Sequence, residues 1–121
     1  MVLIVDDDVD ARVVYRRYLV EKGCVVYTAR NGLVGVACAT SRKPDVIVMD
    51  MAMPRLGGFG AARRLKSAEA TCAIPIIALS GLVISPGAAK AVGCDAFLAK
   101  PCLPEMLWCE IQMFLPRPSR H

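Results

Sequence analysis

Five polar side chains stand directly after short apolar runs of the sequence, a placement from which they could act together. They are Asp6, Asp7, Asp50, Ser80 and Lys100. If the runs are parallel strands, their carboxyl ends meet at one edge of a sheet, where open α/β folds bind ligands. Each residue alone would most often be a solvated acid, a turn hydroxyl or a surface lysine. Their joint occurrence at successive strand ends predicts a functional site.

Three carboxylates and a lysine in a common site favour metal-assisted phosphoryl transfer. Crowded carboxylates repel one another unless a cation is present. Mg²⁺ prefers one or two carboxylates together with waters and phosphate oxygens, and Mn²⁺ could take its place. A carboxylate beside the ion can attack a phosphoryl group and form an acyl phosphate. The metal, Lys100 and the Ser80 hydroxyl would then supply the partners that the transferred oxygens need.

Length and composition indicate a single globular domain. A chain of 121 residues can bury about two-thirds of the surface that its unfolded form exposes. Its hydrophobic content is 55%, but no apolar run approaches the roughly 18 residues that span a bilayer. The first residues lack the charged segment and the cleavage site of a secretory signal. We therefore expect a cytoplasmic protein without membrane insertion.

Six cysteines and a net charge of +4 raise the questions of disulfides, zinc and nucleic acid. No two cysteines have C-x-x-C spacing, and a domain of this length needs no disulfides, so we predict buried free thiols. The basic residues fall in scattered pairs without interleaved aromatic residues. This pattern predicts no direct binding of nucleic acid.

Apolar periodicity predicts five strands that alternate with five helices. The predicted strands cover residues 2–5, 24–29, 46–49, 75–79 and 96–99. The predicted helices cover residues 9–22, 31–41, 59–70, 86–92 and 104–115. Their core-facing residues should include Ala11, Tyr15, Tyr18, Leu19, Val36, Ala37, Phe59, Ala62, Leu65, Leu107 and Ile111. The alternation predicts an α/β fold with a doubly wound five-stranded parallel sheet flanked by five helices. One domain would cover residues 1–115, and residues 116–121 would form a short C-terminal tail.

The sequence resembles the receiver domains of bacterial response regulators. The resemblance rests on V-L-I-V-D-D-D, V-I-V-M-D-M-A-M-P, I-I-A-L-S-G and F-L-A-K-P, which follow in this order between about residues 2 and 115. It implies a flavodoxin-like receiver fold with strand order 2-1-3-4-5. It also implies two-component signal transduction. The domain would accept a phosphoryl group from a phosphohistidine on a histidine kinase or a histidine phosphotransfer protein, and would then switch conformation.

The resemblance also assigns the metal site. Asp50 would be the phosphoacceptor and a metal ligand. Asp7 would bind the metal directly, and Asp6 would act through a water or as a neighbouring acid. The backbone carbonyl of Ala52 would complete the site.

Three further roles follow from the same resemblance. Ser80 and Lys100 would contact the phosphoryl oxygens. Phe97 would turn inward when Ser80 is drawn to the phosphate. The Lys100–Pro101 peptide bond is expected to be cis, a conformation that costs less free energy before proline than before other residues.

Several alternatives stay open from the sequence. Such a domain is no enzyme beyond catalysing its own phosphorylation and dephosphorylation, and it could be a stand-alone regulator, a phosphorelay carrier or a receiver excised from a hybrid kinase. Its oligomeric state is also open. A rival hypothesis is a haloacid-dehalogenase-like phosphohydrolase with Asp6 as nucleophile and Asp8 as acid/base, which leaves Asp50 without a role. Another is a pseudo-receiver that binds a partner without phosphorylation.

Two stretches depart from the receiver pattern. Gly57, Gly58 and Gly60 occupy positions where an acid or amide, a glycine and an acid are usual, which predicts a ragged start of the third helix. The segment 81–92 is shorter than in typical receivers. Two residues after Asp50 and Ser80 stand Ala52 and Leu82. Because neither side chain can orient a water, we expect a long-lived phosphoryl group.

Overall fold

The computed structural model describes residues 1–53, 57–81 and 86–116 and confirms the predicted α/β fold. Five parallel strands form one sheet in the order β2-β1-β3-β4-β5, which is the order that the resemblance implied. The strands are β1 (Val2–Val5), β2 (Val26–Ala29), β3 (Val46–Asp50), β4 (Ile76–Ser80) and β5 (Ala96–Ala99). The predicted tail lies almost entirely outside the described residues, so the domain bounds stay a prediction.

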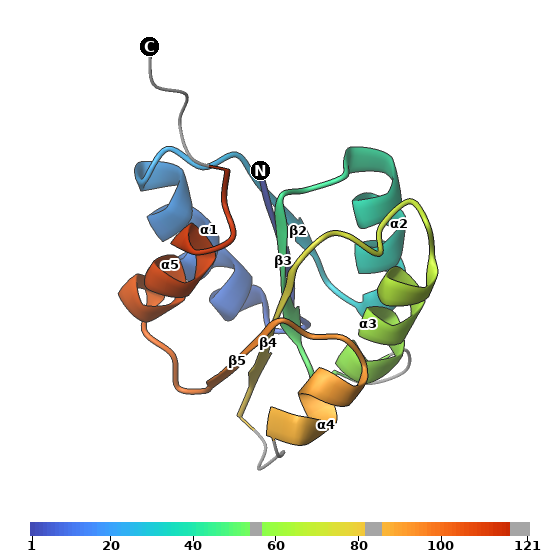
Figure 1. Ribbon diagram of the computed structural model, residues 1–121. Helices are drawn as coiled ribbons and strands as arrows, with labels where there is room; N and C mark the ends of the chain where they lie inside the picture. The colour runs from blue at the N-terminus through green and yellow to red at the C-terminus, as the bar shows by residue number, and fades with distance from the viewer. Residues whose placement is uncertain (54–56, 82–85, 117–121) are drawn as a thin grey trace.

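Helices cover both faces of this sheet (Figure 1). They are α1 (Val9–Glu21), α2 (Gly32–Arg42), α3 (Gly58–Ser67), α4 (Pro86–Ala91) and α5 (Pro104–Gln112). Figure 1 shows α1 and α5 together on one face, and α2, α3 and α4 on the other. The third and fifth helices end a few residues earlier than predicted, because residues 69–73 and 113–114 form turns.

The strands are apolar without interruption because both faces of the sheet are buried. In β1, Leu3 and Val5 belong to the core under α2 and α3, whereas Val2 and Ile4 belong to the core under α1 and α5. The central strand β3 is buried at all five positions, including its terminal acid, Asp50. Packing on both faces of the sheet therefore fixes the register of the strands and the positions of their carboxyl ends.

The predicted core face of α2 is wrong in one position. Ala37 is exposed, and the buried residues of this helix are Gly32, Gly35 and Ala39. A Cβ on Gly35 would lie 2.8 Å from Val5 Cγ2, closer than real Cβ atoms approach a neighbour. The helix thus packs so closely on β1 that small residues, not apolar bulk, mark its buried face.

The glycine at the first residue of α3, Gly58, has a steric cause. The helix begins at Gly58 after Gly57, whose position lacks a side-chain cap hydrogen bond. A Cβ on Gly58 would collide with the backbone carbonyl oxygen of Asp50. Glycine at this position therefore lets α3 begin directly against the end of β3. The start of the helix has no side-chain cap.

The cysteines are all free, as predicted, but they are not all buried. Cys94 and Cys102 are buried, whereas Cys72 and Cys109 are exposed, because they lie in a turn and on the outer side of α5. Within the described residues, every helix is too short or too polar to cross a membrane.

Candidate functional site

The carboxyl ends of β1 and β3 bring three predicted acids together. Val5 pairs with Met49 in the sheet, so that the next residue of each strand segment, Asp6 and Asp50, lies at the same edge. One carboxylate oxygen each of Asp6, Asp7 and Asp50 lies within 4.8 Å of the other two. Asp6 and Asp50 are buried, and Asp7 is exposed. The predicted convergence of the acids is thus present in the structure.

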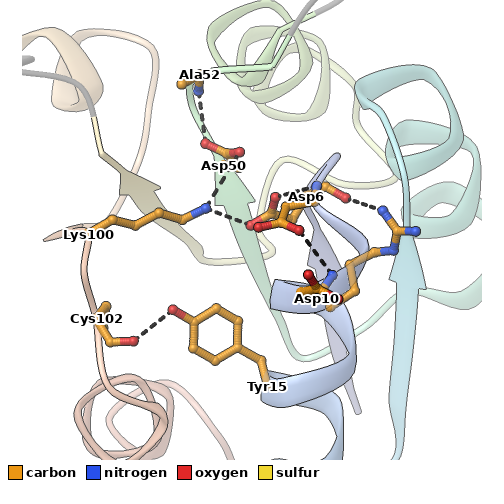
Figure 2. A network of polar contacts seen from close by, with 9 residues as sticks. Asp6, Asp10, Tyr15, Asp50, Ala52, Lys100 and Cys102 are labelled. Carbon is orange, nitrogen blue, oxygen red and sulfur yellow. Dashed lines mark hydrogen bonds and ion pairs between the residues drawn. The ribbon is translucent and has the colours of Figure 1, made fainter.

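Lys100 reaches this acidic cluster from the end of β5. Its Nζ lies 2.9 Å from Asp6 Oδ2 and 3.7 Å from Asp50 Oδ2, and Figure 2 shows it between the two carboxylates. The side chains of Asp6 and Asp50 are 2% and 6% exposed, and that of Lys100 is 24% exposed. The lysine is therefore the cation that offsets two almost fully buried acids.

The polar groups of Asp6 are held from several sides. Its Oδ1 accepts a hydrogen bond from the backbone N–H of Asp8 at 2.9 Å, and its own N–H donates to the Ala29 carbonyl at 3.0 Å. Its carbonyl oxygen accepts a hydrogen bond from Arg12 Nη1 at 2.7 Å. The side chain of Asp8 caps α1 by accepting from the N–H of Asp10 at 3.0 Å.

Burial is the main influence on the charge state of Asp50. It raises the pKa of this carboxyl, and the negative charge of Asp6 adds to the effect. The backbone N–H of Ala52, which donates to Asp50 Oδ1 at 2.9 Å, and the Lys100 ammonium act in the opposite direction. Partial burial alone would lower the pKa of Lys100, but its hydrogen bond and charge interaction with Asp6 raise it overall. The site thus contains more negative charge than the lysine neutralises.

Ser80 and Phe97 lie on the neighbouring strands. Leu79 pairs with Asp50, so Ser80, which is buried, stands one residue further toward the same edge. The backbone N–H of Lys100 donates to the Ser80 carbonyl at 2.8 Å, and the Lys100–Pro101 bond is cis, as expected. Phe97 is half-buried and packs against the core under α2 and α3. Leu82 lies outside the described residues.

Two residues that contact the site were not predicted to do so. Arg12 binds the Asp6 carbonyl, and the Tyr15 hydroxyl donates to the carbonyl of Cys102 at 2.7 Å, in the loop that follows Lys100. The sequence indicated Tyr15 only as a core residue of the helix. Nothing in the pattern of α1 distinguishes Arg12 from the exposed Arg16 one turn later.

The donor set fits a hard divalent cation. Carboxylate oxygens are the ligands that Mg²⁺ and Mn²⁺ prefer. The excess negative charge in a largely buried site gives such an ion a further energetic advantage. No histidine or cysteine belongs to the cluster as it appears in the described residues, which argues against a zinc centre.

A parallel sheet in this order, with three acids and a lysine at one edge, defines a receiver of two-component signalling. The sequence model of the response regulator receiver domain family matches residues 2–112, and the chain belongs to this family. It is 45% identical to the protein PilH of Pseudomonas aeruginosa over 63% of this chain and 63% of PilH. It is 32% identical to the response regulator MprA of a Mycobacterium species over 98% of this chain and 51% of MprA. The chain thus spans between half and two-thirds of the length of these relatives.

Solved structures agree with this assignment. The chemotaxis protein CheY4 of Vibrio cholerae superimposes with a TM-score of 0.87 at 33% identity, covering 94% of this chain and 97% of CheY4. The receiver domain of the sensor histidine kinase PA1611 from Pseudomonas aeruginosa has a TM-score of 0.85 at 28% identity, over 93% and 94% of the two chains. That domain was crystallised with a magnesium ion coordinated in its active-site cleft.

The haloacid-dehalogenase-like hypothesis is not supported. The family match and the similar structures are receivers. In addition, the Asp8 carboxylate is exposed and caps α1 by accepting a hydrogen bond from the Asp10 N–H, which gives it a structural role.

Proposed function

We propose that Asp50 accepts a phosphoryl group from a phosphohistidine with the help of Mg²⁺ or Mn²⁺. The observation that supports this best is the cluster of three carboxylates within 4.8 Å, with Lys100 against two of them. Asp6, Asp7, Asp50 and the carbonyl of Ala52 would hold the ion. The bound ion would supply positive charge to the carboxylates and to the phosphoryl oxygens.

Each residue of the site would have a different role in the reaction. A carboxylate oxygen of Asp50 attacks the phosphorus atom, and the bond from phosphorus to the donor imidazole breaks. The hydrogen bond from Ala52 N–H to Asp50 Oδ1 leaves the second oxygen, which faces Lys100 at 3.7 Å, as the nucleophile. Lys100 is then close enough to pair with a phosphoryl oxygen, and the Ser80 hydroxyl would bind another.

Phosphorylation would be read out through Ser80 and Phe97. Movement of Ser80 toward the phosphate would open space along β4, and the half-buried Phe97 on the adjacent strand β5 would turn inward. A partner would recognise the resulting conformation.

The proposal includes the context of the domain. The donor would be a histidine kinase or a histidine phosphotransfer protein in the cytoplasm, with no direct contact to nucleic acid. Apart from its own phosphorylation and dephosphorylation, the domain, which we assign to residues 1–115, would catalyse no reaction.

Intact-mass measurement with a small-molecule phosphodonor tests this function. Acetyl phosphate with Mg²⁺ should add one phosphoryl group, and chelation of the metal should abolish the addition. Asp50→Asn should abolish it as well. Asp10→Asn, which removes an exposed acid of α1, is the matched control and should react like the unmodified protein. An unchanged mass of the unmodified protein would indicate a pseudo-receiver instead.

A further inference from the structure

The loop between β1 and α1 is held by the hydrogen bond from Asp8 N–H to Asp6 Oδ1 and by a second one from a side chain that lies outside the acidic cluster. Arg12, in the first turns of α1, directs its Nη1 back to the carbonyl oxygen of Asp6 at 2.7 Å. The arginine is half-buried. A guanidinium donor makes a short, charge-assisted hydrogen bond, which is stronger than one between neutral groups.

This hydrogen bond acts on the peptide plane that leads to Asp7. The Asp6 carbonyl belongs to the peptide bond between Asp6 and Asp7, so its orientation sets the direction in which the chain leaves Asp6. The Asp7 carboxylate is exposed and forms no hydrogen bond or ion pair with any of the residues that the structure describes. Apart from its own side-chain torsions, its distance from Asp50 is therefore set by the backbone of the loop.

We propose that Arg12 is a positioning residue for the metal site, which it serves by holding the Asp6–Asp7 peptide in the orientation that directs the Asp7 carboxylate toward Asp50. This inference rests on the proposed function, since it assigns Asp7 to the metal. Partners that orient metal ligands in this way typically change metal affinity by about 10–100-fold when they are removed.

Electrostatics alone predicts that the loss of Arg12 changes the metal affinity in the opposite direction. A positive charge close to the acidic cluster repels a divalent cation, so its removal should strengthen metal binding. If the arginine positions the loop, its removal should weaken metal binding instead. The direction of the change therefore separates the two roles.

Isothermal titration calorimetry with Mg²⁺ alone is the test. Arg12→Met removes the donor and the charge, and Arg12→Lys keeps the charge but not the planar donor group. Arg16→Met is the matched control, because Arg16 is exposed on the same helix one turn away. Thermal unfolding establishes that each variant is folded at the titration temperature. If Arg12→Met does not fold, the comparison of Arg12→Lys with Arg16→Met decides.

We expect the dissociation constant for Mg²⁺ to rise about tenfold in Arg12→Met, to rise less in Arg12→Lys, and to stay equal or fall slightly in Arg16→Met. Unchanged or tighter binding in both Arg12 variants would overturn the positioning role, and so would an equal loss in the Arg16 control. If the unmodified protein binds no Mg²⁺, the proposed metal site itself is wrong. The failure of the inference is thus distinguishable from the failure of the function.

Discussion

Replacement of Lys100 by methionine tests whether the lysine compensates the negative charges of the buried acids. The lysine contacts Asp6 at 2.9 Å and Asp50 at 3.7 Å, and both carboxylates are almost fully buried. Methionine has a similar length and retains the packing of the lysine stem, so the substitution removes mainly the charge. The two acids would then lie together without a cation.

The expected loss of stability follows from this burial. Removing one partner of a buried ion pair costs about 3–5 kcal/mol, because the remaining charge stays desolvated. The side chain of Lys100 is 24% exposed, which allows some hydration of the acids and favours the lower end, about 3 kcal/mol. A domain of this size has a free energy of unfolding of about 5–15 kcal/mol, so the effect is readily measured.

Urea denaturation in the presence of a chelator measures the change. Lys90→Met is the matched control, because Lys90 is exposed and forms no ion pair with the described residues. Saturating Mg²⁺ should narrow the gap between Lys100→Met and the unmodified protein, because the ion would replace the missing charge and bind the variant more tightly. Equal midpoints for the two methionine variants, or a gap that Mg²⁺ leaves unchanged, would refute this reasoning.

Three further predictions concern Asp50, the thiols and the phosphorylated state. Burial raises the pKa of Asp50, so its ionisation lowers stability as the pH rises. Asp50→Asn should therefore stabilise the metal-free protein at neutral pH, and urea titrations should show this advantage vanishing below the ordinary carboxyl pKa of 3.8. Burial also raises the pKa of Cys94 to about 11, so iodoacetamide at mildly alkaline pH should modify the exposed Cys72 and Cys109 first, as peptide mass mapping would show. Finally, the methyl group of Ala52 cannot orient an attacking water, so the phosphoryl group should be long-lived. Its loss from labelled protein within seconds would contradict this expectation.

The sheet was predictable because its strands are buried on both faces. Runs such as residues 46–49 and 75–79 are apolar without alternation, and the terminal polar residues Asp50 and Ser80 mark where the chain leaves the sheet. Since parallel strands share one direction, the convergence of the acids and Lys100 follows from topology alone. The positions of these residues in the structure agree with this argument, although their chemical roles stay proposals.

Close packing and long-range side-chain contacts could not be predicted from the sequence. Apolar periodicity places Ala37 in the core because it ignores how closely a helix can approach the sheet, whereas Gly35 allows α2 to lie directly on Val5. The hydrogen bonds of Arg12 and Tyr15 depend on loops whose shapes no local pattern encodes. A single arginine on an exposed-looking helix face gives no signal of its partner.

The most direct measurement is the location of the phosphoryl group. The protein is phosphorylated with acetyl phosphate and Mg²⁺, the acyl phosphate is reduced with borohydride, and the modified residue is identified by peptide mass mapping. We predict modification of Asp50 alone, because Lys100 pairs closely with Asp6 Oδ2 at 2.9 Å, whereas Asp50 Oδ2 lies 3.7 Å from the ammonium and is the freer oxygen to attack phosphorus. Modification of Asp6, or of a residue outside the cluster, would contradict the account.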